Sequence, residues 1–493
     1  MHNSKTIDLL KSFTTEELHN FSVYLQSPFY NKSKKLIQLF SMLRKHSPDF
    51  VSSKLDKRIL FKSLYKDESY CDKKMRDRIS ILNHHLIQYL SLIQFTKQNY
   101  LLKLCAVREL SHRGLDKIFS NCVQKISHML KSQKIKDDDY FIKKLELESI
   151  VREYYELRQL LGKCGKTYGS LSSEEKDIYS VFAISILKTY LKMYNVESSL
   201  NFEHSLEIAK RTISFIQENK DMCGQSPIVD VLHEFLKLYI CEESCDFESL
   251  KKILDTNRTR LSKALQRDLY IDLYNYCKKR EQNGEIEFGE RALALIKEIE
   301  SNNLLLRGNT LDVQSYINSV ATAIRKHDFG WAVYFNEKYK MFLPLEEKQN
   351  AYNYNLAVIE YMKGKNVKKE KEKKFHYGKA LESLALVQSK DFYYMARIKN
   401  LFLIIYYENN NFNEGMSMID SYMHNLKSDT TIPFKVKVRY KNFTYFVNKL
   451  FQIREQNAFI KINIIKERLN NEVNVEYKNW LHDKIIELEN AKK

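Results

Sequence analysis

The chain has 493 residues but contains only 12 glycines and 5 prolines. Average usage at this length would give roughly 59 glycines and prolines together. Strand-rich folds need these residues at their turns, and α/β folds need glycine in the loops after strands, so both classes are disfavoured. A hydrophobic fraction of 44% with 12% aromatic residues excludes a disordered chain. The composition therefore predicts a large all-α protein.

The charge balance is basic, with 80 Lys and Arg against 62 Asp and Glu. Lys accounts for 60 of these cations and Arg for 20. Proteins that read phosphates or bases rely on Arg, whose planar guanidinium forms two parallel hydrogen bonds. The Lys excess is more typical of a solvated surface, and nucleic-acid binding through that Lys-rich surface is kept as an alternative.

Cysteine usage and the N-terminus bear on the compartment. The eight cysteines include no pair with the CxxC spacing, so buried free thiols are expected rather than a disulfide framework. The N-terminal residues lack the apolar stretch of a signal peptide, and no run of uncharged apolar residues is long enough to cross a bilayer. We therefore expect a cytoplasmic protein without a membrane span.

Residues 1–161 are predicted to form an N-terminal helical region. Thr14 and Glu17 fit a capping box, in which each side chain binds the backbone N–H of the other residue. The helix that follows should end at Ser27-Pro28, because proline disfavours helical geometry in the residue before it. Apolar spacing predicts further helices around 36–43, 59–65 and 72–98, and helical periodicity continues to 161 with breaks near Gly114 and at 137–139.

The stretch 162–173 is rich in glycine and serine and interrupts this periodicity. We interpret it as a loop and a domain boundary. Ser172 and Glu175 fit a second capping box, which predicts that the next helix begins after this loop. The remaining residues, 174–493, then form the second domain.

Helices in this second domain are expected in antiparallel pairs separated by short polar breaks. The dipeptides Asp246-Phe247, Glu287-Phe288 and Asp328-Phe329 recur at intervals of 41 residues. An aromatic residue followed three positions later by a small one also recurs, at Tyr377/Ala380 and Phe412/Gly415. We interpret the aromatic residue as the start of the second helix of each pair. Self-similarity of this length is typical of a helical solenoid.

These residues carry a resemblance to a known family. The segments that contain Asn353–Ala357, Tyr361, Gly364 and Tyr377, and then Ala396, Tyr406-Tyr407 and Phe412, resemble degenerate tetratricopeptide (TPR) repeats. The resemblance implies a right-handed α-solenoid of helical hairpins with a concave peptide-binding surface. Separately, Ser27-Pro28-Phe29-Tyr30-Asn31-Lys32 resembles a motif of an uncharacterised bacterial helical family, to which no function is attached.

Motifs for catalysis or metal binding are weak. Gly165-Lys166-Thr167 lacks the first glycine of a phosphate-binding loop, because Leu160 stands in its place. Cys241 and Cys245, even with His233, offer too few ligands for a zinc site. We therefore expect no cofactor, no metal and no enzymatic activity.

Two basic segments are candidates for binding. The Lys-rich stretch 365–374 is interpreted as an insert between two repeat helices, and the alternating basic residues of 435–441 are placed on a helix that begins near 433. The last helix, near 475–488, is expected to cap the stack. The candidate binding residues are Tyr354, Tyr361, Lys368, Lys369, Lys373, Lys374, Lys437, Arg439 and Lys441. For the tyrosines, packing between helices is the favoured interpretation and contact with a peptide on the concave surface is the alternative.

Together, these patterns predict a non-catalytic protein–protein interaction scaffold or adaptor. A peptide or a partner helix would lie in the concave groove of the solenoid. The alternative is a helical-repeat protein that binds nucleic acid through its lysines.

Overall fold

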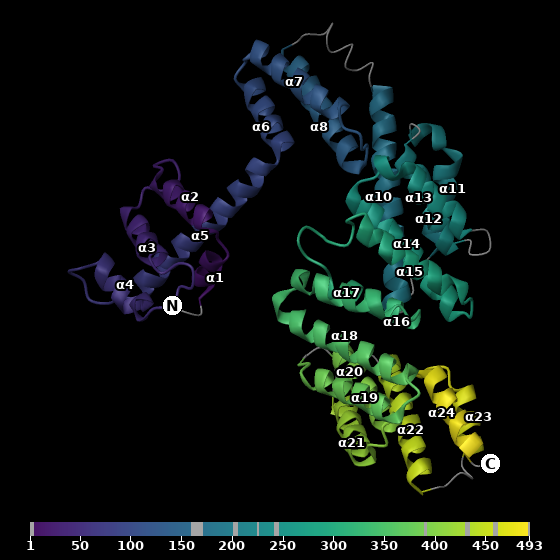
Figure 1. The fold of residues 1–493 in the computed structure, drawn as a ribbon. Helices are drawn as coiled ribbons and strands as arrows, with labels where there is room; N and C mark the ends of the chain where they lie inside the picture. Colours follow the sequence, from purple (N-terminus) through teal and green to yellow (C-terminus); the bar gives the residue numbers. More distant parts are fainter. Residues whose placement is uncertain are drawn as a thin grey trace. The chain divides into compact units, whose positions relative to one another are not determined.

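The computed structural model of the chain describes residues 4–158, 171–200, 206–223, 226–240, 246–388, 392–428, 434–456 and 462–491. These residues form helices joined by short connections, and they contain no β-strand (Figure 1). The all-α prediction is therefore confirmed. No helix among them combines the length and the apolar character that a bilayer crossing requires.

The chain divides into two compact units, Met1–Val181 and Phe182–Lys493, and the division falls inside helix α10 (Leu171–Leu200). The helices of the first unit before α10 are α1 (Lys5–Lys11), α2 (Thr15–Gln26), α3 (Lys34–Arg44), α4 (Lys57–Leu64), α5 (Asp72–Lys97), α6 (Asn99–His112), α7 (Asp116–Lys131) and α8 (Asp138–Leu157). One buried cluster joins α1 to α5, and a second joins α6 to α8.

The sequence signals at the start of this unit act as predicted. In the capping box of α2, the Glu17 backbone N–H donates to Thr14 Oγ1 at 3.1 Å, and the Thr14 N–H donates to Glu17 Oε2 at 2.8 Å. Helix α2 ends at Gln26, and Ser27 is extended before Pro28. These contacts satisfy N–H groups that have no partner inside the helix.

The predicted loop over 162–173 is only partly within the described residues. Residues 171–173 are helical, so the prediction that Ser172 precedes the helix was wrong. An N-cap residue lies outside the helix, whereas Ser172 lies inside it. Serine is tolerated there because first-turn N–H groups need no partner within the helix. The rest of the loop, including Gly165-Lys166-Thr167, lies outside the described residues.

The second unit consists of successive helix pairs. Its helices after α10 are α11 (Leu206–Glu218), α12 (Pro227–Ile240), α13 (Phe247–Asn257), α14 (Lys263–Gln282), α15 (Glu287–Ser301), α16 (Val313–Arg325), α17 (Phe329–Tyr339), α18 (Leu345–Asn366), α19 (Glu370–Ala385), α20 (Phe392–Glu408), α21 (Phe412–Ser428), α22 (Phe434–Gln456), α23 (Ile462–Asn471) and α24 (Lys478–Ala491). Each even-numbered helix from α12 to α22 packs against the odd-numbered helix that follows it.

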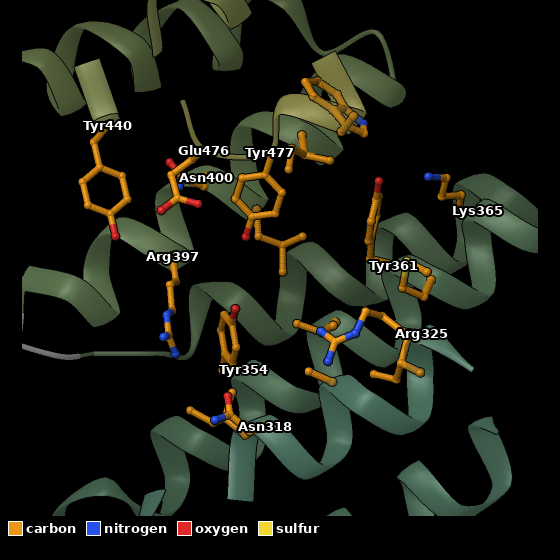
Figure 2. A pocket seen from close by; sticks show the side chains of 18 of the residues that line it. Asn318, Arg325, Tyr354, Tyr361, Lys365, Arg397, Asn400, Tyr440, Glu476 and Tyr477 are labelled. Carbon is orange, nitrogen blue, oxygen red and sulfur yellow. The ribbon is translucent and has the colours of Figure 1, made fainter. Parts of the chain in front are cut away.

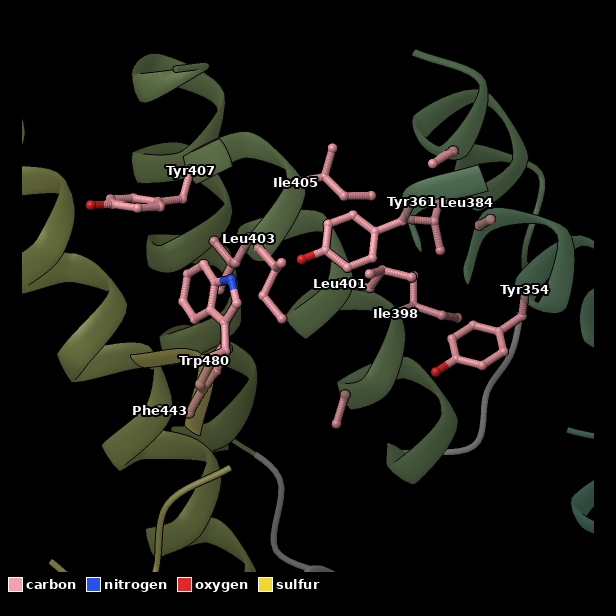
Figure 3. Close-up of a cluster of buried hydrophobic side chains, with 14 of the residues drawn as sticks. Tyr354, Tyr361, Leu384, Ile398, Leu401, Leu403, Ile405, Tyr407, Phe443 and Trp480 are labelled. Atoms are coloured by element: carbon pink, nitrogen blue, oxygen red, sulfur yellow. The ribbon is translucent and has the colours of Figure 1, made fainter. Parts of the chain in front are cut away.

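The even-numbered helices α16, α18, α20 and α22, which we call the first-helix row, also pack against one another in sequence. One continuous buried cluster runs through them and reaches α24 (Figure 3). It is rich in tyrosine, and Tyr361 and Tyr407 lie within it beside aliphatic side chains and Trp480. Trp480, Leu481, Ile485 and Leu488 of the last helix are buried.

The predicted start of the second helix in each pair holds at most positions. Phe247, Phe329 and Phe412 are the first residues of α13, α17 and α21. Asp246 and Asp328 are the N-caps before α13 and α17, and each accepts a backbone N–H three residues later. Tyr377 is an exception, because it lies about two turns inside α19.

The prediction of a Lys-rich insert over 365–374 was wrong. Helix α18 continues to Asn366 and α19 begins at Glu370, so only residues 367–369 connect them. Lys and Glu are good helix formers, and their alternation in 368–374 extends α19 at its N-terminus rather than interrupting the pair. The basic residues of 435–441, in contrast, lie on one helix, α22, which begins at Phe434 as expected.

Candidate functional site

A cavity of about 890 Å³ lies on the first-helix row (Figure 2). Its walls come from α16, α18, α20 and α22, and from Glu476, Tyr477 and Trp480 around the start of α24. All of these elements belong to the second unit. The cavity therefore draws side chains from four successive helix pairs.

The helical repeat explains why these side chains face the same space. On α18, the lining residues Tyr354, Val358, Tyr361 and Lys365 are separated by four, three and four positions. The same spacing occurs on α20 at Arg397, Leu401 and Ile404, and on α16 at Asn318, Ala321 and Arg325. Residues three and four positions apart lie on one face of a helix, so each helix presents a single stripe to the cavity.

Tyrosines form much of the wall. Tyr354 and Tyr361 are only 8% and 7% exposed, because their rings pack against Tyr394 and Tyr377 in the core. Their burial agrees with the packing role that was favoured for these tyrosines, and both also line the cavity. Burial raises the pKa of both phenols above the ordinary value. Both hydroxyl groups thus keep their protons at neutral pH and can donate hydrogen bonds.

The charged groups of the wall are mostly cationic. Arg325, Lys365, Arg397 and Arg439 line the cavity, whereas Glu476 is the one carboxylate among the described lining residues. Glu476 is paired with Arg439, with 2.9 Å between Oε1 and Nε. In a space partly shielded from water, such charges act on one another more strongly than on an open surface.

Asn400 is the most buried polar side chain of the wall. It is 1% exposed, and its Oδ1 atom accepts no hydrogen bond from the described residues. A buried carbonyl oxygen without a donor costs roughly 1–3 kcal/mol. Figure 2 labels Asn400 among the side chains that line the cavity. Asn400 therefore brings to this wall a buried acceptor that has no donor.

The structure brings together only some of the predicted binding residues. Tyr354, Tyr361 and Arg439 line the cavity, and their role in binding stays a prediction. The remaining predicted residues do not line it: Lys368, Lys369, Lys373 and Lys374 lie at the beginning of α19 or just before it, and Lys437 and Lys441 lie on α22.

Sequence reasoning missed Arg325, Arg397, Asn400 and Glu476. The spacing of Tyr354, Val358, Tyr361 and Lys365 is visible in the sequence and could have indicated a common face for α18. Nothing local indicates which face of α16 or α20 meets it, because that depends on how the pairs pack.

Other candidate groups carry no site within the described residues. They contain no cluster of three or more His, Cys, Asp or Glu side chains that could hold a metal ion. Cys241 and Cys245 lie outside the described residues. His85 is buried in the first unit, where its Nδ1 lies 3.3 Å from the Tyr24 hydroxyl.

Comparisons with known proteins add no relative: no family model, curated protein or solved structure matches this chain.

Proposed function

We propose that this chain is a non-catalytic scaffold or adaptor that holds a segment of another protein in the cavity of the first-helix row. On this proposal the helix pairs are TPR-like hairpins stacked in a right-handed solenoid. Support comes from the packing of each pair against the next and from the aromatic residues at the start of α13, α17 and α21.

The observation that carries the proposal is the cavity itself, with Asn400 in its wall. Each of four helix pairs contributes one stripe, so the site can follow an extended ligand over several residues. A polypeptide backbone offers an N–H group at every residue except proline, which is the donor that Asn400 Oδ1 lacks.

The test is selection of peptides from a phage-displayed random library by the full-length protein, followed by binding measurements on variants. Ala321→Trp fills the cavity from α16 and should abolish binding of the selected peptides. Val333→Trp is the matched control, because it adds the same ring at an exposed position on α17 that does not line the cavity. Circular dichroism melting checks that both variants fold.

Asn400→Leu gives an independent readout. It removes the oxygen that has no donor, so the melting temperature should rise while peptide affinity falls about tenfold or more. If Asn400 only supported the fold, Asn400→Leu would lower both the melting temperature and the peptide affinity. The proposal fails if the library yields no peptide that binds, or if Ala321→Trp and Val333→Trp bind the selected peptides equally well.

A further inference from the structure

One of the cavity's cations already holds a carboxylate of this chain. Glu476 lies in the connection between α23 and α24, and its carboxylate accepts from Arg439 of α22. The connection is fixed by Asn442 Nδ2, which donates to the Asn474 carbonyl at 3.0 Å. Lys478 Nζ donates to the Glu472 carbonyl at 2.7 Å. The chain itself thus displays the kind of group that this wall accepts.

Three further cations of the wall have no such partner. Arg325, Lys365 and Arg397 come from α16, α18 and α20, and none lies within 4.0 Å of a carboxylate of the described residues. Arg397 donates to Gln314 Oε1 at 3.2 Å, and Arg325 donates to Thr322 Oγ1 at 3.0 Å. Both acceptors are neutral, so neither contact is an ion pair, although the charge of Arg325 also acts at longer range on Glu281. In Figure 2, Arg397 and Lys365 lie on opposite sides of the cavity.

We infer that the cavity selects an acidic, extended polypeptide segment, whose carboxylates pair with Arg397, Arg325 and Lys365 as Glu476 pairs with Arg439. This inference rests on the proposed function and adds the chemistry of the ligand. Hydrogen bonds between charged groups are the strongest class available here, and guanidinium groups favour carboxylates in particular. The tyrosines between these cations supply apolar ring surface and hydroxyl donors for the rest of the segment.

A polypeptide fits this wall better than a nucleic-acid backbone. Phosphate groups are acceptors only, so they cannot supply the hydrogen that Asn400 Oδ1 lacks. An acidic peptide offers carboxylates to the cations and backbone N–H groups to Asn400. Both kinds of contact are available within one short segment.

The experiment compares a library-selected peptide with a version in which every Asp and Glu is replaced by Asn and Gln. The selected peptides should be enriched in Asp and Glu, and the replaced version should bind at least tenfold more weakly. Arg397→Gln should weaken the acidic version about tenfold and leave the replaced version unchanged. Lys441→Gln is the matched control, because it removes a positive charge from α22 outside the cavity.

Glu476→Gln tests whether the removal of a negative charge from the wall has the opposite effect on affinity. It removes the one negative charge of the described wall and releases Arg439, so affinity for the acidic peptide should rise severalfold. Glu472→Gln, in the same connection but outside the cavity lining, should change nothing. The effects of Arg397→Gln and Glu476→Gln on affinity should both become smaller as the salt concentration increases.

The outcomes separate this inference from the proposed function. If no peptide binds, the proposed function fails and the inference fails with it. If selected peptides bind but lack acidic residues, or if Arg397→Gln weakens both peptide versions equally, only the inference is overturned. It is also overturned if a single-stranded RNA oligonucleotide displaces the acidic peptide and Arg397→Gln abolishes RNA binding.

Discussion

Asn400 and its neighbour Lys399 are both buried on α20, but they have different surroundings. Asn400 lines the cavity, whereas Lys399 is 8% exposed and its Nζ lies 5.3 Å from the centre of the Tyr422 ring on α21. The Asn425 side-chain oxygen lies 2.7 Å from this Nζ in the amide orientation that satisfies both groups. Burial lowers the pKa of Lys399 below its ordinary value. The protonated side chain therefore reduces the stability of the folded state.

The lowered pKa of Lys399 determines the direction in which the free energy of unfolding changes with pH. Between the folded pKa and the unfolded pKa, the unfolded chain binds more protons, so the free energy of unfolding increases as pH rises through this range. Lys399→Met should raise the free energy of unfolding at neutral pH by roughly 1 kcal/mol. It should also remove the contribution of Lys399 to the increase in the free energy of unfolding between neutral pH and about pH 10. Urea unfolding at neutral and alkaline pH measures both effects.

Lys427→Met, at an exposed position on α21, provides the control for a general effect of charge removal. An unchanged pH dependence in Lys399→Met would contradict the assignment of the buried cation as its source.

At the scale of the helix, Gly415 and Gly364 each allow a close contact between neighbouring helices of the second unit. A Cβ atom on Gly415 of α21 would overlap the ring of Phe451 on α22. On Gly364 of α18, it would lie 2.8 Å from the ring of Tyr377 on α19. Both rings are within or beside the continuous buried cluster, so neither can move away freely.

Gly415→Ala should therefore lower the free energy of unfolding by roughly 1–3 kcal/mol, because the added methyl group displaces a buried ring. Gly378→Ala is the matched substitution, since a Cβ there would meet no atom within 4 Å. It should be stabilising by about 0.5–1 kcal/mol through the better helix propensity of alanine. Thermal melting compares the two variants, and equal effects would show that close packing is not what Gly415 provides.

Helix starts and ends were the part of the fold most open to prediction. The capping box at Thr14 and the N-cap residues Asp246 and Asp328 act over three or four residues, so the sequence alone reveals them. The stretch 365–374 misled us because many lysines can reflect either a solvated connection or the polar face of a helix. Residues from α18 and α20 that pack against α19 decide between the two.

At the scale of the whole chain, the two compact units have separate buried clusters. Leu39 belongs to the buried cluster of α1 to α5 in the first unit, and Leu403 belongs to the cluster of the first-helix row in the second unit; both side chains are fully buried. The chain has two tryptophans, Trp331 and Trp480, and both lie in the second unit. Tryptophan fluorescence therefore reports on the second unit, whereas circular dichroism reports on both.

Leu39→Ala should destabilise the first unit by roughly 2–5 kcal/mol and change the circular dichroism transition in urea without moving the tryptophan transition. Leu403→Ala should move the tryptophan transition to lower urea by a destabilisation of the same order. If Leu39→Ala moves the tryptophan transition as far as Leu403→Ala does, the chain unfolds as one cooperative unit and the prediction is wrong.

The sequence by itself determined that this chain is helical, because the scarcity of glycine and proline and the apolar spacing act within single segments. It also indicated Tyr354, Tyr361 and Arg439, which share a cavity in the structure. Only the tertiary structure decided that Arg325, Arg397, Asn400 and Glu476 join them. Their neighbourhood depends on the angle and register at which separate helix pairs pack, and no local pattern encodes a distance between residues that lie more than a hundred positions apart.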